Sequence, residues 1–222
     1  MFEQKDLGGV CLNEGCIPTK TLLYSAKLYD NAKGGEKYGI SAPEVTFDFG
    51  KMMSRKDKVV RKLVGGIAAK MKGHKVETIN ARAVIQRRSA SGVEVEADGQ
   101  VYVAKDVLIC TGSEAVVPPI PGLREAGEVV VTNREILALK DLPESLVVIG
   151  GGVIGTEFAS FFSSLGTRVT VIEMLPEILT GMDPEMSAML RKVLEKKGVD
   201  FHLKARVTAV NGGEVQFEQD GK

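Results

Sequence analysis

Two cysteines near the start of the chain, Cys11 and Cys16, stand five positions apart. On an ideal α-helix this spacing separates the two Cα atoms by about 8–9 Å, whereas a disulfide bridges at most about 7 Å. A disulfide between them therefore requires a distorted or non-helical turn. Three glycines around the pair supply the backbone freedom for such a turn: Gly8, Gly9 and Gly15.

Pro18, two residues after Cys16, predicts the first turn of a helix that the segment from Thr21 to Tyr29 continues. Cys16 would then lie near the helix N-terminus and close to Lys20, where positive potential lowers the pKa of a thiol. Such an environment suits a pair of cysteines that cycles between dithiol and disulfide. The spacing alone is also compatible with two reduced cysteines buried on an ordinary helix.

A second candidate site is the Gly-x-Gly-x-x-Gly run from Gly150 to Gly155. It follows a predicted buried strand and opens a predicted helix, which is the context of a dinucleotide-binding turn. In that role Gly150 makes the turn, Gly152 lets the backbone approach a pyrophosphate, and Gly155 packs the helix on the strand. The pyrophosphate meets the N-terminus of the helix, which Val153 and Ile154 begin.

Glu173 ends the next predicted strand, 18 positions after Gly155. A carboxylate there accepts hydrogen bonds from a ribose 2′-OH and repels a 2′-phosphate, so it predicts NAD rather than NADP. Arg168, at the start of the same strand, is ambiguous because a nearby arginine accommodates NADP. The alternative interpretation of the whole run is a glycine-rich turn followed by a surface glutamate.

Composition narrows the class of protein. The 29 basic and 29 acidic residues cancel, which argues against a nucleic acid or a membrane surface bound through bulk charge. No apolar run approaches the roughly 18–20 residues of a membrane span, and the N-terminus lacks a signal-peptide pattern. Three cysteines among 222 residues do not form a secreted disulfide scaffold. We therefore predict a cytoplasmic protein of one or two packed domains that uses its cysteine pair for redox chemistry.

In the first part of the chain the spacing of apolar residues changes from that of a helix to that of β-strands. A helix over 48–72 carries an apolar stripe that we expect in the core and a basic face that we expect in solvent. Period-two segments over 76–103 then predict a meander of short strands. The apolar run from Val107 to Ser113 predicts a buried strand leading into a tight loop, with Cys110 as a small buried side chain in it.

The second part of the chain opens near Asp141. Strands alternate there with two helices, the second of which is capped by Asp183 and runs to Gly198, and a hairpin follows. Alternation of strands and helices predicts an α/β fold, with a domain over 1–140 and another over 141–222. The apolar side chains of the second helix are expected to face inward, namely Met186, Met189, Leu190, Val193 and Leu194.

The stretch from Leu7 to Lys20 resembles the redox-disulfide segment of the flavin-dependent pyridine nucleotide–disulfide oxidoreductases. Glutathione and mercuric reductases share its Cys-x4-Cys-x3-Lys frame. Within the family, this stretch is most similar to the members that oxidise dihydrolipoamide on a lipoyl carrier protein, through the sequence Gly-Gly-Val-Cys-Leu-Asn-Glu-Gly-Cys-Ile-Pro-Thr-Lys. The resemblance implies Rossmann-like domains, with a partial FAD-binding domain and its β-meander over 1–140 and a partial NAD-binding domain over 141–222. It also implies a homodimer and no metal site.

The resemblance assigns roles to four residues of the redox reaction. Cys11 matches the thiol that exchanges with the substrate, and Cys16 matches the thiol that contacts the flavin. Lys20 matches a lysine near the flavin N5, where its positive charge stabilises the reduced ring. Glu157 matches the glutamate that pairs with this lysine beside the nicotinamide. The alternative for Glu157 is a surface glutamate in the first turns of a helix, which the helix dipole favours.

Further cofactor contacts follow from the same resemblance. Glu3 matches the acidic residue that holds the adenosine ribose of FAD, unless it is only a frayed terminal residue. Ala83 is a further FAD contact, and Val207 matches a position whose backbone touches the adenine of NAD, although it is equally compatible with a strand core. A strand end passes close to FAD in the family and corresponds to Thr111, Gly112 and Ser113.

Parts that the family uses have no match in this sequence. No FAD fingerprint precedes Glu3, and neither His74 nor His202 matches the histidine base that the family takes from the partner subunit. We therefore expect a chain that is truncated at both ends and inactive alone. The alternatives are another disulfide or mercuric reductase of the same family or, for the chain as it stands, a non-catalytic nucleotide-binding module.

Overall fold

The computed structural model describes residues 1–221 and divides them into two compact units. The first unit combines Met1–Pro18 with Asp57–Glu114, and the second combines Thr19–Lys56 with the chain from Ala115 onward. Each unit is thus assembled from two stretches that are far apart in the sequence. The assignment of cofactor domains with a boundary at residue 140 is a separate question and stays a prediction.

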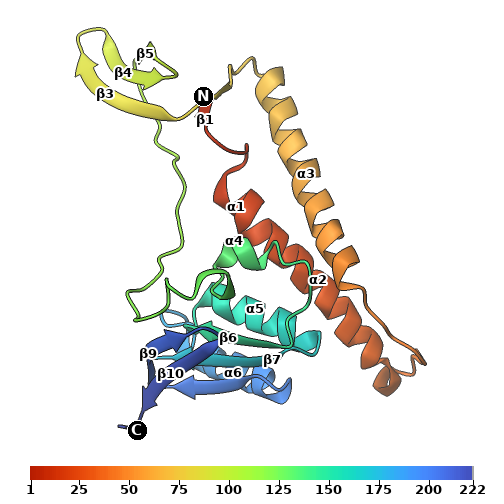
Figure 1. The fold of residues 1–222 in the computed structure, drawn as a ribbon. Helices are drawn as coiled ribbons and strands as arrows, with labels where there is room; N and C mark the ends of the chain where they lie inside the picture. The colour runs from red at the N-terminus through yellow and green to blue at the C-terminus, as the bar shows by residue number, and fades with distance from the viewer. Residues whose placement is uncertain (222) are drawn as a thin grey trace. The chain divides into compact units, whose positions relative to one another are not determined.

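A parallel three-stranded sheet organises the second unit, with β7 between β6 and β8. Parallel neighbours need a crossover connection, and a helix provides each one (Figure 1). The order of strands and helices confirms the predicted α/β class and is that of half a Rossmann fold. In chain order the elements are β6 (Ser145–Ile149), α5 (Val153–Ser164), β7 (Arg168–Glu173), α6 (Pro184–Lys196) and β8 (Asp200–Leu203).

Aromatic side chains of α5 form the centre of the core in this unit. Phe158, Phe161 and Phe162 are each almost completely buried, and the rings of Phe161 and Phe162 meet edge to face with centroids 5.0 Å apart. Helix α2 (Cys16–Lys33) joins the same core through Leu22 and Ala26. Burial of this apolar surface is the main term that holds α2, α5 and the sheet together.

The rest of the second unit consists of a hairpin, short helices and a segment around Pro121 and Gly122 that we call the connector. The hairpin confirms the one predicted from the sequence. The connector lies against it, because Val210 donates its N–H to the carbonyl of Pro121 at 2.8 Å. The elements are η1 (Gly35–Tyr38), η2 (Gly127–Val129), α4 (Asn133–Ile136), β9 (Ala205–Asn211) and β10 (Glu214–Gln219).

The first unit contains an antiparallel meander, a short parallel pair of strands and helices. The meander has the order β3–β4–β5 and confirms the period-two pattern. Strand β1 pairs in parallel with β2, which begins at Ile79. Residues 76–78, which the period-two pattern also predicted as strand, are not in a strand. The elements are β1 (Phe2–Glu3), α1 (Gly9–Glu14), α3 (Phe49–Gly73, shared with the second unit), β2 (Ile79–Asn80), β3 (Ala83–Ser89), β4 (Gly92–Ala97) and β5 (Gln100–Ala104).

The run from Val107 to Ser113 is not a strand, so that prediction is wrong. It takes part in no ladder within residues 1–221, and Leu108 is 88 % exposed. Cys110 is exposed as well, which corrects its expected burial. A strand forms only where a neighbouring strand pairs with its backbone groups, and apolar composition alone does not supply that neighbour.

Helix α6 corrects a second prediction about burial. Its N-terminus is as expected, because the Asp183 side chain accepts the N–H groups of the first turn. Leu194 is buried, but Met186 and Met189 are each 61 % exposed, and Val193 and Leu190 are 44 % and 37 % exposed. A helical side chain is buried only where another element covers it, and the described chain covers mainly the side of α6 that carries Leu194.

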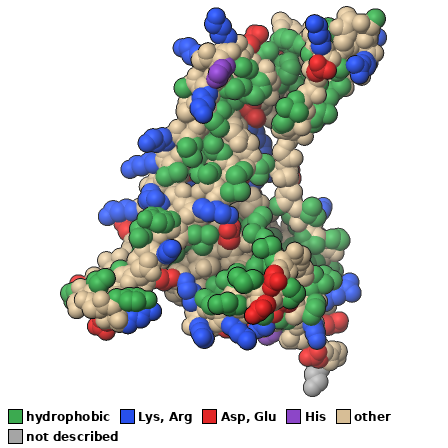
Figure 2. Space-filling model, turned by 180° about the vertical axis from the view of Figure 1, so that it is seen from behind, with side chains coloured by type: hydrophobic (Ala, Val, Ile, Leu, Met, Phe, Trp, Pro, Cys, Tyr) green, Lys and Arg blue, Asp and Glu red, His purple; other side chains and the backbone are tan. Residues whose placement is uncertain are grey.

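Helix α3 also buries less of its apolar stripe than its pattern predicts. The stripe is half-buried, and Leu63 is 41 % exposed. The fully buried residues of α3 are Phe49, Met53 and Lys56, whereas its other basic side chains lie in solvent as predicted. Figure 2 shows hydrophobic side chains among the charged ones at the surface. Among the described helices, none has both the length and the apolar character needed to cross a membrane.

Candidate functional site

The glycine-rich turn has the geometry that its sequence predicts. Gly150 has φ of +103°, a conformation that side chains other than glycine rarely adopt. A Cβ on Gly155 would lie 2.5 Å from the Gly150 carbonyl oxygen and 2.8 Å from Val148 Cγ1, so only glycine lets α5 pack on β6. Gly152 is the N-cap of α5, and no atom lies within 4 Å of an added Cβ there. The turn therefore leaves open space at a helix N-terminus, where anions bind.

Glu173 lies at the end of β7 and faces this turn. Its buried carboxylate accepts the N–H of Gly151 at 2.6 Å on one oxygen and the N–H of Leu175 at 2.8 Å on the other. Glu173 is therefore not the solvated surface glutamate of the alternative interpretation. Each carboxylate oxygen keeps a second lone pair for a further donor.

Gly151 is a closely packed position of the turn to which the sequence assigned no role. A Cβ there would lie 2.8 Å from Ile178 Cγ2 and 3.3 Å from Glu173 Oε2. Its carbonyl accepts the N–H of Leu179 at 2.9 Å and lies 3.2 Å from the hydroxyl oxygen of Thr156. The only signal in the sequence is that a fourth glycine stands at a position of the run where the Gly-x-Gly-x-x-Gly motif requires none.

The segment after β7 is held against the turn from α6. Arg191 donates two hydrogen bonds to the carboxylate of Glu177, at 2.8 and 3.0 Å, and a third to Glu195 at 2.6 Å. The bonds from Arg191 are the main reason that the pKa of Glu177 lies below its usual value. This paired geometry holds in place the segment that carries Ile178 and Leu179, the neighbours of Gly151.

Lys20 and Glu157 form an ion pair in the second unit. Lys20 Nζ lies 2.7 Å from Glu157 Oε1, and the side chains are 57 % and 24 % exposed. Lys20 is in the N-terminal part of α2, and Glu157 is on α5 two residues after Gly155. The pair therefore joins the helix that begins at Cys16 to the helix that the glycine-rich turn opens.

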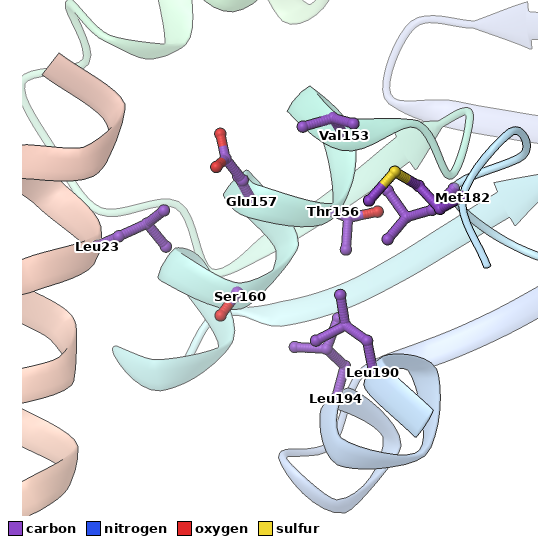
Figure 3. A pocket seen from close by; sticks show the side chains of 9 residues that line it. Leu23, Val153, Thr156, Glu157, Ser160, Met182, Leu190 and Leu194 are labelled. Carbon is purple, nitrogen blue, oxygen red and sulfur yellow. The ribbon is translucent and has the colours of Figure 1, made fainter. Parts of the chain in front are cut away.

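A cavity of about 260 Å³ lies beside this pair. In Figure 3 Leu23 extends from α2 toward α5, and Leu190 and Leu194 extend from α6. Glu157 contributes the charged group of a lining that is otherwise apolar or uncharged. The remaining lining residues are Val153, Thr156, Ser160, Leu179 and Met182.

The cysteine motif lies in the first unit and has a broken helical backbone. Cys11 is in α1, Cys16 begins α2, and Gly15 separates the two helices with φ of −136° and ψ of −114°. A Cβ on Gly15 would lie 3.2 Å from the Cα of Cys11. The break at Gly15 is the non-helical turn that a disulfide between the two cysteines would require, and both cysteines are exposed rather than buried.

The other predicted FAD contacts also lie in the first unit. A Cβ on Gly112 would lie 3.0 Å from Val10 Cγ2, so the segment 111–113 lies against the cysteine motif. Glu3 is in β1, and its backbone carbonyl accepts the N–H of Ala81, two residues before the exposed Ala83. Thr111 and Ser113 flank Gly112 and are likewise exposed.

The second unit thus brings together the glycine-rich turn, Glu173, Lys20 and Glu157. Val207 lies half-buried in β9 of the same unit. The histidines belong to neither group of candidate residues: His74 follows α3 in an exposed turn, and His202 contacts Asp200 and Gln219 in the second unit. Among residues 1–221, no cluster of three or more His, Cys, Asp or Glu side chains has the arrangement of a metal site.

Residues 1–222 match the family described as pyridine nucleotide-disulphide oxidoreductase. A dihydrolipoyl dehydrogenase of Acholeplasma laidlawii is 45 % identical over 225 residues, which cover 100 % of this chain and 66 % of that protein. A dihydrolipoyl dehydrogenase of Bacillus subtilis is 40 % identical over 227 residues, which cover 100 % of this chain and 48 % of that protein. The chain therefore spans 48–66 % of the length of these relatives.

Two solved structures share the fold. The HOCl-induced flavoprotein disulfide reductase RclA of Escherichia coli has a TM-score of 0.79 and 30 % identity, over 99 % of this chain and 47 % of that chain. LpdA from Mycobacterium tuberculosis has a TM-score of 0.85 and 24 % identity, over 97 % of this chain and 48 % of that chain. At that lower identity the likeness is one of fold only.

Proposed function

Because the chain belongs to the pyridine nucleotide-disulphide oxidoreductase family, we propose that it is the central part of an FAD- and NAD-dependent dihydrolipoyl dehydrogenase. The proposed substrate is dihydrolipoamide on a lipoyl carrier protein. The names of its relatives, which match over the whole chain, support this choice. Activity belongs to the whole protein, which we propose to be a cytoplasmic homodimer with neither a nucleic-acid nor a membrane partner.

The observation that carries the proposal is the ion pair between Lys20 and Glu157. In a disulfide oxidoreductase electrons pass from the cysteine pair through the flavin to NAD, so the cysteine helix and the helix after the nucleotide turn both contribute residues to the site. The 2.7 Å contact joins α2 to α5, the helix that follows the nucleotide turn, through oppositely charged side chains. By holding the ammonium group of Lys20, the Glu157 carboxylate would keep a positive charge available to stabilise a reduced flavin ring.

The dithiol chemistry assigns one role to each cysteine. A thiolate of dihydrolipoamide attacks the Cys11 sulfur of the Cys11–Cys16 disulfide, and Cys16 leaves as a thiolate. The second substrate thiolate then attacks the substrate's own sulfur in the mixed disulfide, which forms the S–S bond of lipoamide and breaks the bond to Cys11, so Cys11 leaves as a thiolate. Overall the substrate loses two electrons and two protons, NAD takes up a hydride, and one proton is released. The exposure of both cysteines supports this exchange.

NAD fits the second unit through main-chain and carboxylate groups. The open space at Gly152 and the N-terminus of α5 would receive the pyrophosphate, beside the exposed Val153 and Ile154. Glu173 would accept a ribose hydroxyl on its remaining lone pairs. Val207 would offer its backbone to the adenine.

The residues proposed to hold FAD lie in the first unit, and one segment of them lies against Val10. Gly112 has φ of +76°, so the segment of Thr111, Gly112 and Ser113 turns sharply beside the cysteine motif. Glu3 would hold the adenosine ribose, and Ala83 would add a contact near it. Bound FAD supplies a two-electron relay between the cysteine pair and NAD.

Purification of the whole protein tests this proposal. The purified protein should be yellow and should reduce NAD with dihydrolipoamide, whereas a colourless, inactive protein would contradict the proposal. A substrate panel with oxidised glutathione and Hg²⁺ identifies the other reductases of the family. Binding of NAD without turnover of any dithiol would instead identify a nucleotide-binding module.

A further inference from the structure

Three helices of the second unit end at one polar junction, formed by Asp30, Ser164 and Lys197. Asp30 is in the last turn of α2, Ser164 is the last residue of α5, and Lys197 is the C-cap of α6. Lys197 Nζ donates to Asp30 Oδ2 at 2.6 Å and to Ser164 Oγ at 2.9 Å. The Ser164 hydroxyl also lies 2.8 Å from the same Asp30 oxygen. We call these three residues the helix-end junction.

Electrostatics make Lys197 the centre of this junction. The C-terminal end of each helix carries a partial negative charge, and Asp30 adds a full one. The side chains of Lys197 and Asp30 are only 35 % and 31 % exposed, and Ser164 is buried, so water screens these charges incompletely. Without the ammonium group, the negative charge of Asp30 would lie beside the partial negative charge at the end of α5 with only the Ser164 hydroxyl donating to it in this junction.

The junction lies on the same two helices as the ion pair of the candidate site. Asp30 follows Lys20 by ten residues on α2, and Ser164 follows Glu157 by seven residues on α5. Between the two polar contacts the helices share an apolar core, in which Leu22 is buried. Apolar contacts are not directional, so the two polar contacts define how far one helix is shifted along the other.

We propose that the helix-end junction is a positioning site for the redox reaction: it fixes the register of α2 on α5 and thereby holds Lys20 at Glu157. The expected effect on turnover rests on the proposed function. The coupling between the helix-end junction and the ion pair of Lys20 and Glu157 does not. None of the three residues touches a reacting atom. They act through α2, which transmits a shift at one end to the other because a helix is stiff.

A double-mutant cycle measures the coupling without any cofactor. The variants are Lys197→Met, Glu157→Gln and the double variant, and the readout is the equilibrium constant of unfolding in urea. If the two sites are independent, the factors by which the single substitutions change the equilibrium constant of unfolding multiply in the double variant. If the sites are coupled, the double variant departs from that product by about threefold or more. The control cycle uses Lys196→Met, one residue earlier and exposed, and is expected to multiply. Multiplicative effects for Lys197 as well would overturn the proposal.

Turnover of the flavin-loaded protein gives the second readout. Lys197→Met should lower kcat about tenfold with little change in the KM for dihydrolipoamide, because small misplacements of catalytic groups are costly. Lys197→Arg keeps the cation and should restore most of kcat, and Lys196→Met should match the wild type. An unchanged kcat in folded Lys197→Met would refute the positioning role.

Two further provisions keep the test decisive. If Lys197→Met does not fold, Ser164→Ala replaces it in both experiments, because it removes the bridging hydroxyl and leaves the ion pair of Asp30 and Lys197. If the wild-type protein binds no flavin or does not oxidise dihydrolipoamide, the proposed function fails, and the double-mutant cycle still decides on the junction.

Discussion

The main-chain N–H of Gly151 donates a hydrogen bond of 2.6 Å to the carboxylate of Glu173, which joins the glycine-rich turn directly to the end of β7. The second oxygen of the same carboxylate accepts the N–H of Leu175. Glu173 is thus a structural residue of the turn as well as the proposed ribose ligand. A substitution of Glu173 can therefore change both the stability of the fold and the affinity for NAD, and the two must be measured separately.

Glu173→Gln should destabilise the fold. The carboxylate pairs one N–H with each oxygen, whereas glutamine has one oxygen and an NH₂ group that would face an N–H donor. One buried donor then stays unpaired, at a cost of about 1–3 kcal/mol in the free energy of unfolding. Urea denaturation of the protein without nucleotide measures it. The exposed Glu214→Gln is the control, expected within about 0.5 kcal/mol of the wild type; the same result for Glu173→Gln would show that its bonds do not stabilise the fold.

Two glycines of the turn should give opposite results. Gly152→Ala places a methyl group in open space with an ordinary φ of −71°, so stability should hold while NAD binding weakens. Gly155→Ala forces a Cβ against the Gly150 carbonyl and should cost about 1–3 kcal/mol of stability. Urea denaturation and titration with NAD separate the two effects. Strong NAD binding by Gly152→Ala would contradict the proposed pyrophosphate position.

Gly122→Ala should destabilise the second unit for two reasons. Gly122 has φ of +77°, and a Cβ there would overlap the carbonyl oxygen of Val210. Gly127 has φ of +63° with no atom within 4 Å of an added Cβ, so Gly127→Ala keeps only the backbone strain of about 1–2 kcal/mol. Gly122→Ala should therefore have a lower midpoint of thermal unfolding than Gly127→Ala. Equal midpoints would mean that the connector yields at Val210.

Stability below neutral pH should depend on Glu177. Its pKa lies below the ordinary value of 4.5, chiefly because Arg191 donates to the carboxylate. A pKa that is lowered by folding stabilises the fold above the unfolded-state pKa, and this contribution is lost as the pH falls through the folded-state pKa. The pair is about one quarter exposed.

The variant Glu177→Gln lacks this contribution at every pH. Between about pH 6 and pH 3, wild-type protein should therefore lose about 1 kcal/mol more of its unfolding free energy than Glu177→Gln does. Urea denaturation at both pH values measures the difference, with the exposed Glu185→Gln as the control. Parallel losses in wild type and Glu177→Gln would contradict the assignment to this carboxyl.

Cys16→Ser should abolish turnover of dihydrolipoamide while FAD stays bound. The serine hydroxyl does not form the disulfide that accepts the electrons of the dithiol, whereas its volume is similar to that of the thiol. Flavin absorbance and NAD reduction are the two measurements. Cys110→Ser is the matched control, because Cys110 is exposed and has no assigned role; retained turnover in Cys16→Ser would contradict the proposed mechanism.

Local features of the fold were predictable from short stretches of sequence. The break in the helix at Gly15, the left-handed turn at Gly150 and the Asp183 cap each depend on a few neighbouring residues. The alternation of strands and helices after Asp141 likewise predicted a parallel sheet, because parallel strands need crossover helices. Pairing of Lys20 with Glu157 was expected only from the resemblance to a family, since 137 positions separate them and no spacing rule spans that distance.

The cysteine turn, the nucleotide turn and the α/β order follow from backbone preferences and short-range periodicity, so they could be predicted from the amino-acid sequence. Which apolar side chains are covered depends on the packing of distant segments and was seen only in the folded chain. The tertiary structure exposes Cys110, Met186 and Met189 although their patterns predict burial. It also decided that Gly151 contacts Glu173 and that three helices end at Lys197. Burial and pairing of this kind require surfaces from distant segments to meet, and a local pattern contains no information about the partner.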